Sequence, residues 1–147
     1  MARVSTYLNF QGNTAEAFEF YKSVFGTDYV TPAMRMGDVP ADPNSPELSD
    51  AEKDMVMHVE LEILGGHVIM ATDMIESMGH KLVVGNNTTI NLEPDTRDET
   101  DRLYGALSEG GSDCSGMMDM FWGAYWGCCL DRFGIRWMFN HYGELPA

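Results

Sequence analysis

The sequence predicts an α+β fold in which one order of elements, a strand, a helix and three more strands, occurs twice within 147 residues. The first observation is a repeated opening, because alternating runs at residues 7–10 and 89–92 each lead into a helix-start pattern. The second is a repeated hairpin, with its tip at residues 65–66 in one copy and 133–134 in the other. A repeat of this length indicates two similar units, and we expect the functional cavity to be the one that they share.

The first copy begins with a strand at residues 3–10 and continues into a helix. Asn13 is a suitable N-cap, and Glu16 three residues later completes a capping-box pattern. Gly26 provides the left-handed residue that ends many helices, and a second strand is expected at residues 28–36. The side chains expected to face the sheet recur at helical spacing, and they are Ala17, Phe20, Tyr21, Val24 and Phe25.

Residues 38–54 form the one long segment without a regular pattern, since prolines interrupt any strand ladder and acidic residues dominate the rest. We expect a mobile loop over one end of the sheet, which serves either as a lid or as a plain connection. A hairpin is then expected at residues 56–73, where apolar and polar side chains alternate with the period of a strand.

The second copy follows a linker. Thr96 and Glu99 repeat the capping-box pattern at the start of its helix, and an apolar stripe includes Leu103 and Leu107. Its strands are expected at residues 87–93 and 112–118 and in a hairpin at 124–142. The expected organisation is a single domain, 1–147, with module one at about 3–73, the linker at 74–85 and module two at about 86–142.

Charge and composition limit the partners and the compartment. A net charge of −14 with only nine lysines and arginines argues against nucleic acid and against an anionic membrane as partners. No apolar run is long enough to span a bilayer, and we expect no signal peptide from the pattern of the first residues. Three cysteines, two of them adjacent, make a poor disulfide framework. We therefore expect a cytoplasmic protein.

Several segments carry a resemblance to a known family: Tyr7–Phe10, Ala17–Gly26, Met34–Asp38, Met57–Val59, Phe121–Tyr125 and Asp131–Met138. They resemble the PhnB-like branch of the vicinal oxygen chelate (VOC) superfamily, which includes glyoxalase I, bleomycin-resistance proteins and extradiol dioxygenases. The resemblance implies two βαβββ modules whose mixed sheets curl around a shared cup. PhnB-like proteins often carry a demethylubiquinone methyltransferase label. Methyltransferase activity is not expected here, because no Gly-rich loop after a first strand indicates an S-adenosylmethionine site.

The resemblance also implies where a metal would bind. In metal-binding members each module gives one ligand from its first strand and one from its last, typically His, Glu or Gln. Those positions fall on Thr6 and Met70 in module one, and on Thr89 and Met138 in module two. Two threonines and two thioethers are poor ligands for Zn, Ni, Mn or Fe(II), so we expect neither a metal nor a cofactor.

His58 and Glu60 are the fallback candidates for a metal site. They stand two residues apart on a strand and therefore share a face, although the alternation of an amphipathic strand explains them without any metal.

The remaining candidate site residues are those whose strand parity points into the cup. Together with the aromatic positions near the last hairpin, the candidate ligand-binding residues are Thr6, Met70, Asn87, Thr89, Asn91, Trp122, Tyr125, Arg136, Met138 and Asn140. Arg136 either anchors an anionic ligand or pairs with an internal carboxylate such as Glu60. The aromatic residues either pack in the core or at a dimer interface, or form a stacking wall for a flat ligand.

Three functions remain open from the sequence. The first is a metal-independent protein, a homodimer, that binds a small-molecule ligand. The second is a glyoxalase-like enzyme, either a lyase, isomerase or dioxygenase that depends on a metal, or an enzyme without a cofactor. The third is a structural or regulatory dimer whose cup is filled by its own side chains.

Overall fold

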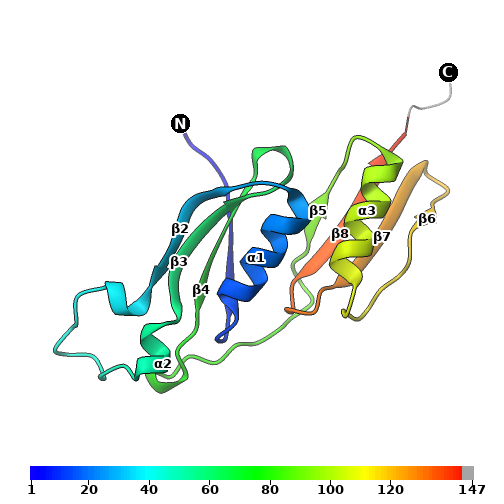
Figure 1. Ribbon diagram of the computed structural model, residues 1–147. Coiled ribbons are helices and arrows are strands. Elements are labelled where there is room, and N and C mark those ends of the chain that lie inside the picture. Colours follow the sequence, from blue (N-terminus) through cyan, green and yellow to red (C-terminus); the bar gives the residue numbers. More distant parts are fainter. Residues whose placement is uncertain (144–147) are drawn as a thin grey trace. The chain divides into compact units, whose positions relative to one another are not determined.

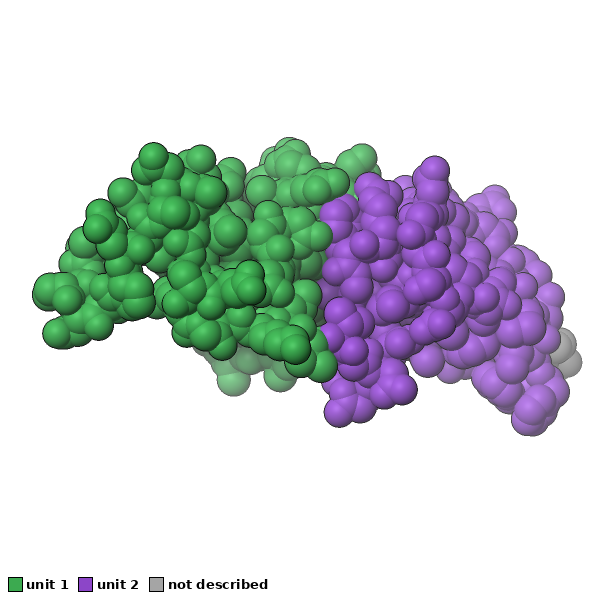
Figure 2. Space-filling model, turned by 90° about the horizontal axis from the view of Figure 1, so that it is seen from below, with its two compact units in different colours: residues 1–83 green, residues 84–147 purple. Residues whose placement is uncertain are grey.

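The computed structural model describes residues 1–143 of the chain. The first five major elements are β1 (Thr6–Phe10), α1 (Thr14–Phe25), β2 (Tyr29–Arg35), β3 (Val56–Glu62) and β4 (Val68–Asp73) (Figure 1). The next five are β5 (Ile90–Leu92), α3 (Arg97–Ser108), β6 (Met118–Asp119), β7 (Ala124–Leu130) and β8 (Arg136–Tyr142). The chain divides into two compact units, residues 1–83 and 84–147 (Figure 2). No helix within residues 1–143 is long and apolar enough to cross a membrane.

Each unit contains one four-stranded sheet, and the two sheets have the same topology. The strand order is β1-β4-β3-β2 in the first and β5-β8-β7-β6 in the second. In both sheets the first strand pairs in parallel with the last, while the other pairs are antiparallel. The predicted α+β class and the repeated βαβββ module are therefore confirmed.

Helix α1 covers one face of the first sheet (Figure 1). Phe10 of β1 packs edge-on against Phe18 of α1, with ring centroids 6.2 Å apart. Ala17, Tyr21 and Val24 are buried as predicted, and Phe18 is buried with them. Phe20 and Phe25 are only half-buried, contrary to prediction, because they lie at the edge of a stripe centred on residues 17, 18 and 21.

The carboxylate of Asp73, at the end of β4, caps the N-terminus of α1. One oxygen, Oδ1, accepts hydrogen bonds from the backbone N–H of Gly12 at 3.0 Å and of Thr14 at 3.1 Å, and from the Thr14 hydroxyl at 2.6 Å. The other accepts from the N–H of Val56 at 2.8 Å. The side chain of Asn13 makes no capping hydrogen bond, so the predicted capping box was wrong at this helix.

Helix α3 covers one face of the second sheet in the same way. Leu103 and Leu107 are buried against Trp137 and Phe139 of β8, all at 1% exposure or less. The Thr96 half of the predicted capping box is present, because the Thr96 hydroxyl accepts from the N–H of Glu99 at 3.1 Å. The Glu99 carboxylate accepts from the guanidinium of Arg102 in the same helix.

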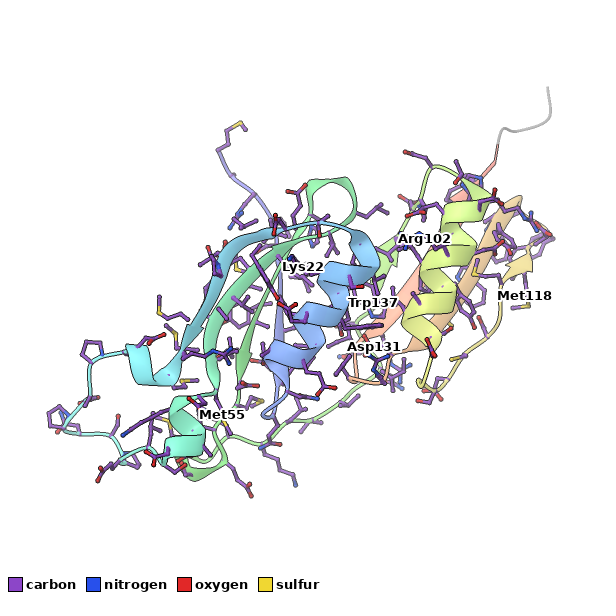
Figure 3. The ribbon with its side chains drawn as sticks, viewed as in Figure 1. Lys22, Met55, Arg102, Met118, Asp131 and Trp137 are labelled. Carbon is purple, nitrogen blue, oxygen red and sulfur yellow. The ribbon has the colours of Figure 1, made fainter. Side chains whose placement is uncertain are left out.

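A buried carboxylate also organises the turn between β7 and β8. Asp131 accepts from the indole N–H of Trp137 at 2.8 Å, and these two side chains are labelled in Figure 3. It also accepts from the backbone N–H of Phe133 and of Ile135, which fixes the turn around the predicted tip.

Three predicted segments differ from the structure. The strand expected at 87–93 is only Ile90–Leu92. The strand expected at 112–118 is reduced to an isolated bridge between Ser112 and Leu130 and the two-residue β6, because Asp113 has a positive φ of 52° that interrupts the ladder. The loop at 38–54 contains a short helix, α2 (Asp50–Lys53); its predicted mobility stays a prediction.

Candidate functional site

The helix of each unit covers one face of its sheet, and the opposite face, which we call the open face, is polar. In the first sheet the side chains that alternate with the buried ones are half-buried or exposed, and they include Tyr7, His58, Glu60, Met70 and Thr72. Strand register shows that they are neighbours, since Tyr7 pairs with Met70 and Met70 with Glu60.

The register corrects the predicted position of Thr6. Thr6 pairs with Ile69, which is buried under the helix, whereas Tyr7 pairs with the predicted Met70. The Thr6 hydroxyl instead lies 2.8 Å from Nε2 of His67. The predicted parity of β1 was therefore shifted by one residue, and a shift of one residue moves a side chain to the other face of a strand.

Four side chains on this open face form a hydrogen-bonded row that we call the polar chain. The Tyr7 hydroxyl lies 3.4 Å from Nδ1 of His58, and Nε2 of His58 lies 3.1 Å from Oε1 of Glu60. The Thr31 hydroxyl of β2 donates to Oε2 of Glu60 at 3.3 Å. The polar chain thus reaches from β1 to β2, and sequence parity alone had identified only its two central members.

Hydrogen-bond chemistry fixes the protons in the polar chain. An ionised carboxylate only accepts, so Nε2 of His58 must carry the hydrogen that bonds to Glu60. In the neutral imidazole Nδ1 is then the acceptor, and the Tyr7 hydroxyl donates to it. The hydrogen bond from His58, reinforced by that from Thr31, holds the pKa of Glu60 below its usual value. The polar chain therefore presents an oriented imidazole beside a fixed negative charge.

The second sheet has an open face with amide and thioether side chains. Asn91 of β5 pairs with Met138 of β8, and the side-chain amide of Asn140 donates to Oδ1 of Asn91 at 2.7 Å. Trp126 and Cys128 of β7 share this face, because they pair with Asn140 and Met138. The structure thus brings together three predicted residues, Asn91, Met138 and Asn140, and adds Trp126 to them.

Arg136 lies on the same face but already has partners within its own unit. Its Nε donates to the carbonyl oxygen of Gly85 at 3.0 Å, and its guanidinium lies 3.2 Å from the carboxylate of Asp113. The carboxylate that pairs with Arg136 within its own unit is thus Asp113, and the suggested pairing with Glu60 of the other unit stays a prediction. Asn87 and Thr89 are exposed on the segment before β5.

The two predicted aromatic site residues do not join this face. Tyr125 alternates to the helix side, where its hydroxyl donates to Asp101 of α3 and the guanidinium of Arg97 lies 3.7 Å from the centre of its ring. Trp122 lies in the turn before β7, 49% exposed, and its ring meets that of Phe121 edge-on at 5.0 Å. The predicted cup position of Tyr125 is therefore corrected.

Comparison with known proteins agrees with this architecture. The family described as 3-demethylubiquinone-9 3-methyltransferase matches residues 2–139. The crystal structure of protein PA1353 from Pseudomonas aeruginosa is 33% identical, with 96% of this chain and 98% of that chain covered and a TM-score of 0.79. The chain belongs to this PhnB-like family, and it shares its fold with proteins of the glyoxalase/bleomycin-resistance/dioxygenase superfamily.

Two further solved structures share the fold of this PhnB-like chain. One is a putative 3-demethylubiquinone-9 3-methyltransferase, PhnB protein, from Bacillus cereus, at 22% identity, 95% and 99% coverage and a TM-score of 0.73. The other is a glyoxylase/bleomycin resistance protein/dioxygenase domain from Frankia sp. EAN1pec, at 11% identity, 98% and 93% coverage and a TM-score of 0.65.

The residues of this PhnB-like chain do not fit the metal site that the superfamily implies. The open-face positions of the paired first and last strands are Tyr7 and Met70 in one unit, and Asn91 and Met138 in the other. Within residues 1–143 no three His, Cys, Asp or Glu side chains are grouped as metal ligands. The polar chain offers one imidazole and one carboxylate, fewer than the three protein ligands of typical catalytic zinc sites.

Proposed function

We propose that this PhnB-like protein binds a small organic molecule on the open face of its first sheet without the help of a metal ion. The observation that carries this proposal is the polar chain of Tyr7, His58, Glu60 and Thr31, which is oriented by internal hydrogen bonds on a sheet face that no helix of its unit covers. Met70 lies between Tyr7 and Glu60 in the sheet and adds an adaptable apolar surface.

The chemistry of this face indicates the class of ligand. Glu60 is ionised at neutral pH and accepts hydrogen bonds, so it favours a ligand group that donates an N–H or O–H and disfavours an anion. Half-buried aliphatic and aromatic surface beside a few fixed polar groups suits a partly apolar molecule. We therefore propose a neutral or cationic ligand with a hydrogen-bond donor.

The polar chain also favours a second candidate function, an enzyme that transfers a proton. A histidine whose ring is oriented by a carboxylate is the usual arrangement of a general acid–base catalyst, and it needs no metal. Here Glu60 fixes the tautomer of His58, and Nδ1 faces the Tyr7 hydroxyl. A bound substrate that displaces this hydroxyl would meet the free electron pair of Nδ1.

Methyl transfer receives no support from the first strand–helix turn. The N-terminal N–H groups of a helix are where nucleotide and phosphate groups bind in many folds. Here the backbone N–H groups of Gly12 and Thr14 already donate to the carboxylate of Asp73. Neither N–H group is therefore free to bind an anionic group of a cofactor, and the negative charge of Asp73 would repel such a group.

We propose further that the protein forms a homodimer and is located in the cytoplasm. Exposed apolar side chains gather near the β6–β7 turn, where Phe121 is 97% exposed and Met118 and Trp122 accompany it. Exposed aromatic and methionine side chains are typical of protein–protein interfaces, which supports association of two copies.

The test is a screen of small organic molecules by thermal shift, followed by titration calorimetry of any molecule that stabilises the protein. Glu60→Gln should weaken binding by roughly tenfold or more, because it removes a charged hydrogen-bond acceptor. Tyr7→Phe should weaken it less. His67→Gln is the matched control, because His67 bonds to Thr6 on the other side of β1.

Elemental analysis of the protein as purified completes the test. We expect transition metals well below one equivalent. Stoichiometric metal that is required for binding, or full affinity in Glu60→Gln, would overturn the proposal.

A further inference from the structure

Two of the three cysteines lie on adjacent chain segments in the second unit. The backbone of Ser112 exchanges hydrogen bonds with Leu130 at 2.9 and 2.8 Å, and the N–H of Ser115 donates to the carbonyl oxygen of Cys128 at 3.0 Å. Between these two points Asp113 and Cys114 on one segment oppose Cys129 alone on the other. This is the geometry of a bulge, and the positive φ of Asp113 agrees with it.

Both thiols point to the side of the sheet that α3 covers. Sγ of Cys114 lies 3.4 Å from the carbonyl oxygen of Ser112 and 4.0 Å from that of Ser108, the last residue of α3. Cys129 is 2% exposed among the side chains under α3. Burial raises the pKa of Tyr104 in α3 and that of Cys129, and the neighbouring thiols add smaller contributions, from Cys114 and Cys129 at Tyr104 and from Cys114 at Cys129, so the three groups lie in one cluster.

We propose that Cys114 and Cys129 are a peroxide-responsive dithiol that closes to a cross-strand disulfide. Cys129 sits at a position of β7 whose neighbours, Cys128 and Leu130, make the backbone hydrogen bonds to the facing segment. Residues at a regular non-hydrogen-bonded position of antiparallel strands have Cα atoms about 4.5 Å apart. Disulfides span about 4.4–6.8 Å, so this range leaves room for the wider spacing that the extra residue of the bulge introduces. Cys128 alternates to the open face and pairs with Met138, so it is outside this cluster.

The chemistry proceeds in two balanced steps. The exposed Cys114 thiolate attacks one oxygen of hydrogen peroxide, the O–O bond breaks, and a sulfenic acid and water result after one proton is taken up. The Cys129 thiolate then attacks the sulfenic sulfur and displaces the hydroxyl group, which leaves as water. Two thiols and one peroxide give one disulfide and two waters. Cys114 reacts first because Cys129 is buried.

The order of steps has a measurable consequence. Burial raises the pKa of the Cys129 thiol to about 12, so little of it is thiolate at neutral pH. The second step is therefore slow, and the sulfenic acid at Cys114 accumulates before the disulfide. Disulfide formation should accelerate as the pH rises from about 7 to about 9, roughly tenfold per unit, because the thiolate fraction of Cys129 rises by that factor.

The experiment treats the full-length reduced protein with hydrogen peroxide, counts free thiols, and maps linked peptides by mass spectrometry. Wild type and Cys128→Ser, the matched control, should each lose two thiols within one chain and give a Cys114–Cys129 link. Cys129→Ser should stop at a sulfenic acid on Cys114 that dimedone traps, and Cys114→Ser should keep its two remaining thiols reduced.

Three results would overturn the proposal: a link that includes Cys128, a disulfide between two chains, or oxidation of Cys114 to sulfinic acid in wild type without any Cys114–Cys129 link. The wild-type peptide map alone decides these outcomes, so the test does not depend on the folding of a variant. A rate of the second step that stays the same when the pH is raised by one unit would also contradict it.

Discussion

Asp73 makes more hydrogen bonds to other segments of the first unit than its place at the end of a strand suggests. It is 3% exposed, and its two oxygens accept four hydrogen bonds, from the turn before α1, from Thr14 and from the start of β3. One side chain therefore joins β4 to α1 and to β3. Removal of this carboxylate leaves several buried N–H and O–H donors without an acceptor, and each unpaired donor lowers the stability of the folded state.

Asp73→Ala should lower the free energy of unfolding by about 2–4 kcal/mol, since it removes a cap and leaves buried donors unpaired. Asn13→Ala should change it by less than about 0.5 kcal/mol, because the Asn13 side chain makes no capping hydrogen bond. Urea unfolding of both variants measures the difference. A larger loss for Asn13→Ala than for Asp73→Ala would restore the capping role that the sequence suggested.

This residue shows where sequence reasoning stops. The pattern Asn13…Glu16 is a normal helix start, and it predicted the position of α1 well. The residue that caps the helix, Asp73, lies 59 residues from Thr14 along the chain, and no local sequence pattern predicts it. Gly26, in contrast, ends the helix with φ 63° as predicted, because the left-handed conformation is a property of the residue itself.

Cys129 gives a prediction for alkaline pH. Its pKa is raised to about 12 in the folded state from a reference value of 9.0, so the folded state favours the neutral thiol. The resulting stabilisation is fully present below pH 9 and is lost as the pH rises toward 12. At pH 10 the loss should be about 1 kcal/mol. Cys129→Ala should show a smaller decrease between pH 8 and pH 10 in urea unfolding, and an equal decrease would contradict the assignment.

At the scale of elements, the order of strands and helices was predictable, but the face of β1 was not. Period-two alternation and glycine stops define elements locally, which is why β3, β4, β7 and β8 lie where the sequence places them. In β1 both faces carry large side chains, since Leu8 and Phe10 alternate with Tyr7 and Asn9. Only pairing with β4 decides which set is buried, and that decision moved Thr6 out of the candidate site and Tyr7 into it.

The edge strand β6 depends on one arginine. Its two residues pair with β7 only, and Arg97 of α3 donates to both carboxylate oxygens of Asp119 at 2.7 and 2.8 Å while its guanidinium stacks on Tyr125. The hydrogen bonds from Arg97 lower the pKa of Asp119, so this contact is present near neutral pH and is lost as the pH falls through that lowered pKa.

Arg97→Lys should therefore speed amide hydrogen exchange at Met118 and Asp119 several-fold, because an ammonium group cannot reproduce the two-point contact or the stacking. The control is Arg102→Lys, because Arg102 pairs with Glu99, which lies one turn away in the same helix. Exchange in β6 that is equally fast in both variants, or unchanged in Arg97→Lys, would show that β7 alone holds this strand.

At the scale of the whole molecule, the repeat determines the fold and leaves the function open. Both units show the same βαβββ order, yet their open faces differ, with an imidazole and a carboxylate on one and amides with an arginine on the other. The hydrophobic pattern repeats because both sheets must be buried under a helix, while nothing in packing requires the open faces to match. A cavity shared by the two modules stays a prediction.

The charge of the whole chain gives the last prediction. Aspartates and glutamates number 23 against nine lysines and arginines, so most carboxylates have no basic partner to pair with. Added salt weakens surface ion pairs such as Arg97–Asp119 and also weakens the repulsion among unpaired carboxylates. Repulsion should dominate at a net charge of −14.

Raising NaCl from about 0.01 to 0.15 M shortens the screening length from about 30 to 8 Å, and the melting temperature at pH 7 should rise by a few degrees. At about pH 5.5, nearer the isoelectric point of about 4.4, the same salt step should have a smaller effect because less charge remains to be screened. Calorimetry at both pH values measures this, and a melting temperature that falls with salt at pH 7 would mean that ion pairs outweigh the repulsion.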